Sequence, residues 1–153
     1  MALSVGEGVK YFTADWWLGD HRGNHDPLQH YECYLQTIRP ALPQVLRVLE
    51  SEHTLHDANV SQISAIGVDG SLSMELRGWD RGLQFPVCYS LSFFGVSDSQ
   101  GLAVENDDLE GLGDLGYCEL ELVDAGIEMR MLFASAHEIR IVFKDFSFSS
   151  EPI

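Results

Sequence analysis

The spacing of apolar residues changes once along the chain, and this change constrains the fold more than any other feature of the sequence. In the first third, apolar residues recur every three or four positions, which places them on one side of an α-helix. They are Leu28, Tyr31, Leu35, Ile38, Leu42, Val45 and Leu49. After Leu55, apolar and polar residues alternate, as in a strand with one buried face. The pattern predicts an α+β protein in which helices precede strands.

Residues 1–54 are predicted to form the helical part of a single domain that spans residues 1–153. Asp26-Pro27 marks the start of a long helix, because an acidic N-cap and a proline in the first turn are typical there. Pro40 and Pro43 each remove a backbone donor. They should divide this helix into two pieces that share one buried face. The rival interpretation of the same spacing is a coiled coil.

A shorter helix is predicted before the long one. Thr13 is a suitable N-cap, Asp15 favours the positive end of the helix dipole and Gly19 is a suitable stop. The residues that follow, 19–26, are polar and contain glycine, so they are predicted to form a loop.

Residues 55–149 are predicted to form a mostly antiparallel sheet of about six or seven strands, with the helices packed on it. The predicted strands cover 60–68, 72–76, 85–93, 102–104, 117–123, 127–133 and 139–148. Asp69-Gly70 has the composition of a tight hairpin turn, and Pro86 suits an edge position. The connections between strands are short, which favours antiparallel neighbours over helical crossovers.

The formal net charge of −15 is the most unusual global property, with 24 acidic against 9 basic residues. A nucleic-acid-binding protein needs Lys and Arg to replace phosphate counterions, and an anionic membrane surface would repel this chain. We therefore expect no nucleic acid and no membrane as partner. Two interpretations of the charge stay open: it maintains solubility, or it meets a basic protein partner.

The N-terminus and the cysteines predict a cytoplasmic protein. The first ten residues contain neither a basic region nor a continuous apolar run, so no signal peptide is expected. Cys33, Cys88 and Cys118 are odd in number and widely spaced, which disfavours a disulfide framework. Cys33, on the long helix, is predicted to be a small core residue.

Three patterns partly match known cofactor or metal sites, but we predict neither a cofactor nor a metal. Gly111-Leu-Gly-Asp-Leu-Gly116 matches the dinucleotide fingerprint, yet a strand follows it where a helix is needed, and neighbouring acids would repel pyrophosphate. The same segment partly resembles a calcium loop, but Tyr117 stands where a bidentate Glu belongs. His21, His25 and His30 are interpreted as exposed rather than as metal ligands.

Four residues are the candidates for a catalytic site, if there is one. His56 and Asp57 stand at the junction of the helical and sheet parts, where they can hold a turn or serve in acid–base or metal chemistry. Glu119 and Glu121 fall on one face of a strand, opposite the apolar face. That face is expected either to meet solvent with cross-strand charge pairs or to fold into a cleft.

Several short motifs follow one another along the chain: Tyr11-Phe12-Thr13, Trp17, Leu55-His56-Asp57-Ala58, Tyr117-x-Glu119, Phe133-x-Ser135 and the run Glu138-Ile139-x-Ile141-x-Phe143-x-Asp145-Phe146. In these motifs and their order the chain resembles a family of small bacterial proteins of unknown function. The Leu-His-Asp step that enters the sheet is also similar to that of bacterial immunity proteins, which neutralise toxins by binding. The first resemblance implies kinship without an activity, a substrate or a cofactor.

Three functions follow from these observations. The leading hypothesis is a non-enzymatic, acidic protein-binding domain, with an immunity-type inhibitor of a basic toxin as one instance. The alternative is a metal-dependent or acid–base hydrolase that uses His56 and Asp57 with Glu119, Glu121 or His137. The third is a homo-oligomer joined through an exposed apolar strand at Leu91-Ser-Phe-Phe94.

Overall fold

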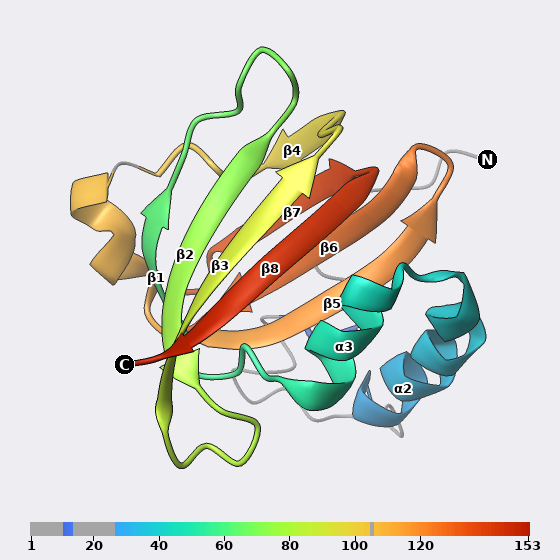
Figure 1. The fold of residues 1–153 in the computed structure, drawn as a ribbon, viewed down its shortest axis with the longest axis horizontal. Helices are drawn as coiled ribbons and strands as arrows, with labels where there is room; N and C mark the ends of the chain where they lie inside the picture. The colour runs from blue at the N-terminus through green and yellow to red at the C-terminus, as the bar shows by residue number, and fades with distance from the viewer. Residues whose placement is uncertain (1–10, 14–26, 105) are drawn as a thin grey trace.

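The computed structural model describes residues 11–13, 27–104 and 106–153, which form helices beside two sheets (Figure 1). The helical elements are α2 (Pro27–Ile38), η1 (Arg39–Ala41), α3 (Gln44–Glu52) and η2 (Asn106–Leu112), where η denotes a 3-10 helix. The strands are β1 (Asn59–Ile63), β2 (Leu72–Trp79), β3 (Pro86–Phe94), β4 (Asp98–Gln100), β5 (Leu115–Val123), β6 (Gly126–Phe133), β7 (Glu138–Phe143) and β8 (Asp145–Pro152). The predicted α+β class is confirmed. Among the described helices, none is both long and apolar enough to span a membrane.

The prolines divide the helical part as predicted. α2 ends at Ile38, Pro40 lies in the short η1 turn, and Pro43 precedes α3, which starts at Gln44. Each proline lacks a backbone donor, so the helical ladder cannot continue through this segment. The short helix predicted for 13–19 and the loop after it fall mostly outside the described residues.

The two helices share one buried face, but its register changes at the break. On α3 the fully buried residue is Leu46, and the predicted Val45 is only partly buried, because the helix restarts after Pro43. Leu28, at the start of the predicted stripe, is 57% exposed. The buried residues of the helical part are Tyr31, Leu35, Ile38, Leu42, Leu46 and Leu49.

The strands form two four-stranded sheets, which corrects the prediction of one sheet of six or seven strands. The order is β1-β2-β3-β8 in the first sheet and β4-β7-β6-β5 in the second. Every strand pair is antiparallel, as predicted. We call them the first sheet and the second sheet.

Two paired segments pass from the first sheet into the second at a shared bend. Phe94 on β3 pairs with Asp145 on β8, and Asp98 on β4 pairs with Val142 on β7. Between these pairs, three residues on one segment face two on the other, as in a β-bulge, which bends and twists a strand pair. Hydrogen bonding continues through the bend, where the Lys144 N–H donates to the Phe94 carbonyl at 2.9 Å.

The bend explains why the strand predicted over 139–148 is wrong. The segment is two strands, β7 and β8, which meet at Lys144 and belong to different sheets. Opposite Lys144, Gly95 has a φ of 65°, and a Cβ at this position would lie 3.1 Å from the Lys144 Cβ. Glycine adopts this left-handed conformation without steric cost, so it suits the bend.

Three further details differ from the sequence predictions. Pro86 is the first residue of β3, a central strand between β2 and β8, where a missing backbone donor is also tolerated. The short strand is β4, whereas residues 102–104 form no strand. Gly70, with a φ of 78°, serves a turn in a longer β1–β2 connection rather than a two-residue hairpin.

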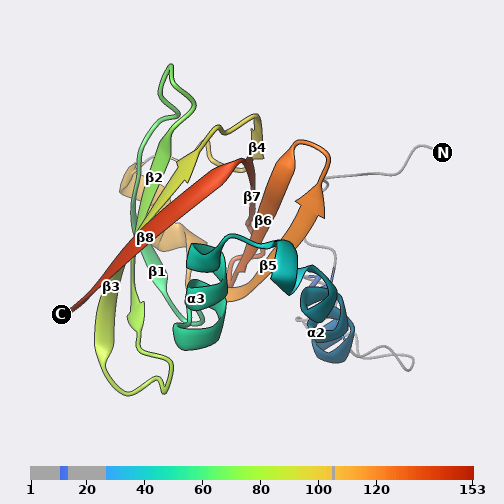
Figure 2. The ribbon, with the colours of Figure 1, turned by 45° about the vertical axis from the view of Figure 1, so that its right-hand side comes forward.

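The two sheets are also tied where the chain enters β1. The Asp57 N–H donates to the Leu115 carbonyl, and the Leu115 N–H donates to the Ala58 carbonyl, both at 2.8 Å. Figure 2 shows the sheets splayed apart on the side of the helices, with α3 beside β8 and α2 beside β5. The core lies between the sheets and includes the edge-to-face pairs that Phe93 makes with Phe143 and Phe146.

Helix α2 protects the edge of the second sheet. β5 is an edge strand, and its outward N–H groups would otherwise be open to pairing with another chain. The Leu120 N–H donates to the Tyr31 hydroxyl at 2.7 Å, and the Leu122 N–H donates to the Tyr34 hydroxyl at 3.1 Å. Two tyrosines on successive turns of α2 thus take the place of a neighbouring strand.

We predict that Tyr31→Phe destabilises the protein by about 1–3 kcal/mol, because it leaves the buried Leu120 N–H without its acceptor. Tyr34→Phe is the matched control and should cost less than about 1 kcal/mol, since water can reach its half-buried site. Urea unfolding of both variants measures the difference. Equal losses for the two variants would contradict this role of Tyr31.

Candidate functional site

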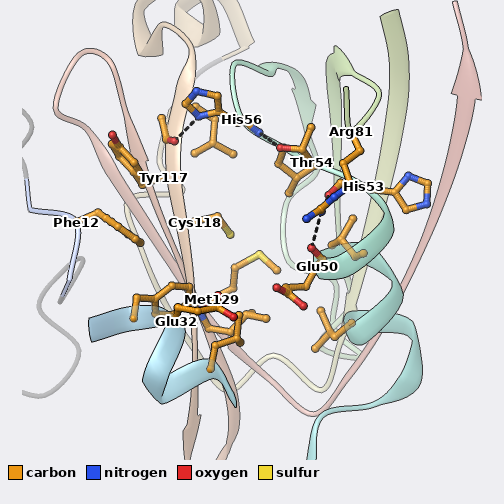
Figure 3. Close-up of a pocket in the computed structure, with 18 residues that line it drawn as sticks. Phe12, Glu32, Glu50, His53, Thr54, His56, Arg81, Tyr117, Cys118 and Met129 are labelled. Carbon is orange, nitrogen blue, oxygen red and sulfur yellow. Dashed lines mark hydrogen bonds between the residues drawn. The ribbon is translucent and has the colours of Figure 1, made fainter. Parts of the chain in front are cut away.

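A cavity lies between the helices and the β5 edge, and we call it the wedge cavity (Figure 3). Its volume is about 300 Å³. The apolar side chains that line it come from α2, α3, β5, β6 and the segment before β1. They are Leu35, Leu46, Leu49, Leu55, Leu115, Leu120 and Met129. Phe12, Tyr31, Tyr117 and Cys118 also line it, and the Cys118 thiol points into the space (Figure 3).

Two charged residues at the cavity rim, Glu50 and Arg81, are held by intramolecular hydrogen bonds. Arg39 Nη2 donates to both carboxylate oxygens of Glu50, at 3.1 and 3.2 Å, and this hydrogen bond raises the pKa of Arg39. Arg81 Nη1 donates to the backbone carbonyls of Glu50 and His53, at 3.0 and 3.1 Å. Arg81 therefore satisfies carbonyls at the C-terminal end of α3, which lack intrahelical donors.

His56 and Asp57 hold the turn that leads into β1. The Thr54 hydroxyl accepts from the His56 N–H at 3.1 Å, and His56 Nδ1 lies 2.8 Å from the Gly116 carbonyl. A carbonyl only accepts, so the geometry assigns the proton to Nδ1. His56 Nε2 is 3.5 Å from Asp57 Oδ1. Asp57 has a φ of 65°, which aspartate tolerates better than most residues.

Glu119 and Glu121 lie apart from that turn, in an ion-pair network centred on Arg130. Glu119 Oε1 accepts from Arg130 Nε at 3.1 Å, and Glu121 Oε1 accepts from Arg130 Nη1 at 2.8 Å. The other oxygen of Glu119 accepts from the backbone N–H groups of Tyr11 and Phe12, both at 2.6 Å. Glu119 thus joins the N-terminal segment to the second sheet.

The network continues across the second sheet. Arg130 also pairs with Glu128, Arg140 Nε donates to Glu128 Oε1 at 2.6 Å, and Arg140 Nη2 donates to Asp98 at 3.0 Å. Burial lowers the pKa of Arg130 and of Arg140, but the surrounding carboxylates outweigh it, so both pKa values are raised. The predicted cross-strand charge pairs therefore exist.

The face that carries this network is buried, so of the two expected arrangements the one in which it meets solvent is wrong. Glu119, Glu128 and Arg130 are 0%, 1% and 3% exposed. Among the buried groups, two glutamates are matched by two arginines, Arg130 and Arg140, whereas Glu121 and Asp98 are more exposed. Within the described residues, no three His, Cys, Asp or Glu side chains are grouped so as to hold a metal ion.

The structure therefore separates the predicted candidates into two groups. Of the four, only His56 lines the wedge cavity; the Asp57 carboxylate lies beside the His56 ring, and the two glutamates belong to the network. His137 lies elsewhere, with Nε2 2.8 Å from the Gly101 carbonyl. His21 and His25 are outside the described residues. The cavity itself was missed, because distant segments create it and no local pattern marks it.

The outer face of the first sheet is exposed, in contrast to that of the second, and we call it the open face. Its strand register places Trp79, Pro86 and Ile153 in one row and Arg77, Cys88 and Glu151 in the next. Trp79 is 38% exposed and Ile153 is 64% exposed. Phe94, at the other end of β3, is 43% exposed. The remaining rows are rich in serine: Ser73, Ser90, Ser92, Ser147 and Ser149.

A signal for the open face was present in the sequence. Leu72, Met74 and Leu76 alternate inward, so continued alternation places Trp79 on the opposite, outward face. In the strand predicted as an oligomer contact, Leu91 and Phe93 point into the core, whereas Phe94 is exposed on the open face, and β3 has strand neighbours on both sides. The predicted core residue Cys33 is exposed on α2.

Comparisons of the chain with protein families, with curated proteins and with solved structures gave no match. The class of protein is therefore defined by the structure alone. It is an α+β protein of two antiparallel sheets, with a covered and an exposed outer face and a cavity under its helices.

We predict that Arg130→Met destabilises the protein by about 3–5 kcal/mol, because buried carboxylates lose their cationic partner. Arg39→Met is the control; it breaks a half-exposed ion pair and should cost about 0–1 kcal/mol. Denaturant unfolding at neutral pH compares them. A cost for Arg130→Met no greater than that for Arg39→Met would show that the network does not stabilise the fold.

We also predict that the three thiols react in a fixed order. Cys33 is exposed, burial raises the pKa of Cys88, and burial raises the pKa of Cys118 to about 12. The raised pKa lowers the thiolate fraction of Cys118 at pH 8, and the thiolate is the reactive form. Titration with a disulfide reagent should therefore modify Cys33 first, Cys88 next, and Cys118 only after unfolding.

The double variant Cys33→Ser/Cys88→Ser isolates the third thiol. It should be inert in the native state and become fully reactive in denaturant. Fast native reaction of this variant would mean that the Cys118 environment is not the buried one described.

Proposed function

We propose that this protein acts by binding a basic partner protein, without catalysing a reaction, and that the open face makes the contact. The observation that carries the proposal is the exposed apolar row of Trp79, Pro86 and Ile153, on a sheet face whose other rows are mostly serines and charged residues. Exposed apolar patches mark interaction sites, and tryptophan is enriched among the residues that dominate binding energy.

The charge of the open face favours a basic partner. Glu75, Asp145 and Glu151 stand on this face with one guanidinium, that of Arg77. The chain as a whole carries a net charge of −15, which speeds encounter with a basic protein. Small serine side chains leave the sheet surface flat, so a partner can approach the backbone closely.

The placement of the candidate residues supports binding more than hydrolysis. The alternative, a metal-dependent or acid–base hydrolase, needs at least three of the side chains of His56, Asp57, Glu119, Glu121 and His137 to converge in a pocket. The first two hold a turn by backbone contacts, and the two glutamates neutralise Arg130. An immunity-type inhibitor of a basic toxin, in a bacterial cytoplasm, is one form that the proposed binding role would take.

We predict that Trp79→Ala abolishes specific capture of a partner from a lysate of the source cell, because it removes the large exposed anchor of the apolar row. Leu28→Ala is the control: Leu28 is 57% exposed but lies on α2. Capture by wild type and by the control should persist at low salt and weaken as salt rises.

Two results would contradict the proposal. One is the absence of any specific partner at low or moderate salt. The other is a partner that Trp79→Ala captures as well as wild type does. Light scattering of the purified protein, run in parallel, identifies the case in which the face is covered by a second copy of this chain instead.

A further inference from the structure

We propose that the wedge cavity is a binding site for a small, neutral, mainly apolar molecule. This site is distinct from the open face, so it does not depend on the proposed protein partner. The cavity is bounded by two helices, the β5 edge and the turn before β1 (Figure 3). Each boundary is fixed by contacts already described, and the space is a consequence of how the sheets diverge.

The size of the cavity suits a small molecule. Its volume of about 300 Å³ is at the lower end of the range for ligand sites. Side chains in a protein core normally leave few voids larger than a water molecule. The space is open at its rim, so a small molecule can enter it from solvent and gain contacts with the lining.

The apolar side chains of the lining favour a ligand that is mostly apolar. Leucines from α2 and α3 face Leu120 and Met129 from the second sheet across the space. Pockets with a mostly apolar lining favour apolar ligands, because water makes few hydrogen bonds at the apolar part of the wall. Burial keeps the Cys118 thiol protonated, so it contributes a weak, neutral donor rather than a charge.

The charges at the rim specify a neutral molecule. The Glu50 carboxylate is already paired with Arg39, and Arg81 donates to backbone carbonyls. Glu32, also at the rim, pairs with Arg39 at 3.6 Å. A charged ligand would have to displace these bonds or lose its own hydration without compensation. The net charge of −15 further disfavours an anion.

One polar group of the ligand has a partner at the rim. The Thr54 hydroxyl accepts from the His56 N–H at 3.1 Å, and within the described residues its own proton has no acceptor. Thr54 lines the cavity beside His56 (Figure 3). A hydroxyl or carbonyl on an otherwise apolar ligand can therefore bond there, which fixes its orientation.

The test uses 2-naphthol, a neutral ring system with one hydroxyl, and 2-naphthalenesulfonate as its anionic counterpart. Isothermal titration calorimetry with the full chain should show saturable binding of 2-naphthol, and binding of the sulfonate weaker by at least about tenfold, or 1.4 kcal/mol. Absence of saturable 2-naphthol binding overturns the proposal. Equal affinity for the sulfonate overturns the assignment of a neutral ligand.

Two substitutions of cysteine by phenylalanine locate the binding. Cys118→Phe fills the cavity and should abolish 2-naphthol binding, whereas Cys88→Phe places the same side chain on the open face and should leave it unchanged. If Cys118→Phe does not fold, the smaller Cys118→Leu should still weaken binding several-fold. Unchanged binding by a folded Cys118 variant overturns the site.

The same two variants distinguish the ligand site in the wedge cavity from the proposed protein-binding site on the open face. Cys88→Phe changes the open face and is expected to impair partner capture, while Cys118→Phe is expected to leave capture intact. Loss of 2-naphthol binding without loss of capture, or the reverse, identifies which of the two sites has been affected.

Discussion

The bend shared by β3–β4 and β7–β8 is the constraint on which the rest of the structure depends. The paired segments keep their hydrogen bonds as they pass from one sheet to the other, so the sheets are held at an angle by the backbone itself. Phe93, Phe143 and Phe146 fill the space near the bend. Where the sheets diverge, the helices enter and the wedge cavity forms.

The ion-pair network favours one register of the strands, although burying its charges costs desolvation free energy. Buried charges stabilise little unless each is well paired, and here two arginines alternate with four carboxylates across four strands. A shift of β5 by one residue against β6 would carry Glu119 from the network to the core side. Such a misalignment is strongly disfavoured. The network therefore fixes the register of the second sheet. Tyr31 and Tyr34 on α2 accept hydrogen bonds from the edge strand of that sheet, so their positions must match this register.

Most elements could be predicted because their signals are local. The break in the long helix follows from Pro40 and Pro43, and the strand faces follow from alternation. The division of 139–148 was missed although a signal exists: inward residues have odd numbers up to Phe143 and even numbers from Phe146. A change of phase in an apparently continuous strand marks a bend between sheets.

The candidate site was less predictable, because burial depends on which segment covers a face. The pairing of Glu119 with Arg130 follows from neighbouring strands, and the sequence indicated it. The contact that buries Glu119 comes in part from Tyr11 and Phe12, more than 100 residues earlier. No local pattern encodes that contact. The wedge cavity likewise requires Leu46, Cys118 and Met129 to meet from separate elements.

The contrast between the two outer faces has a physical explanation. The outer face of the second sheet carries charges, which are costly to bury, and yet it is covered. The outer face of the first sheet carries Trp79, Pro86 and Phe94, which gain from burial, and yet it is exposed. If solubility alone had shaped this chain, the charges would face water and the aromatic residues would be covered. The reverse arrangement is the one that the proposed binding role of the open face requires, because a partner that covers this face would bury its aromatic residues.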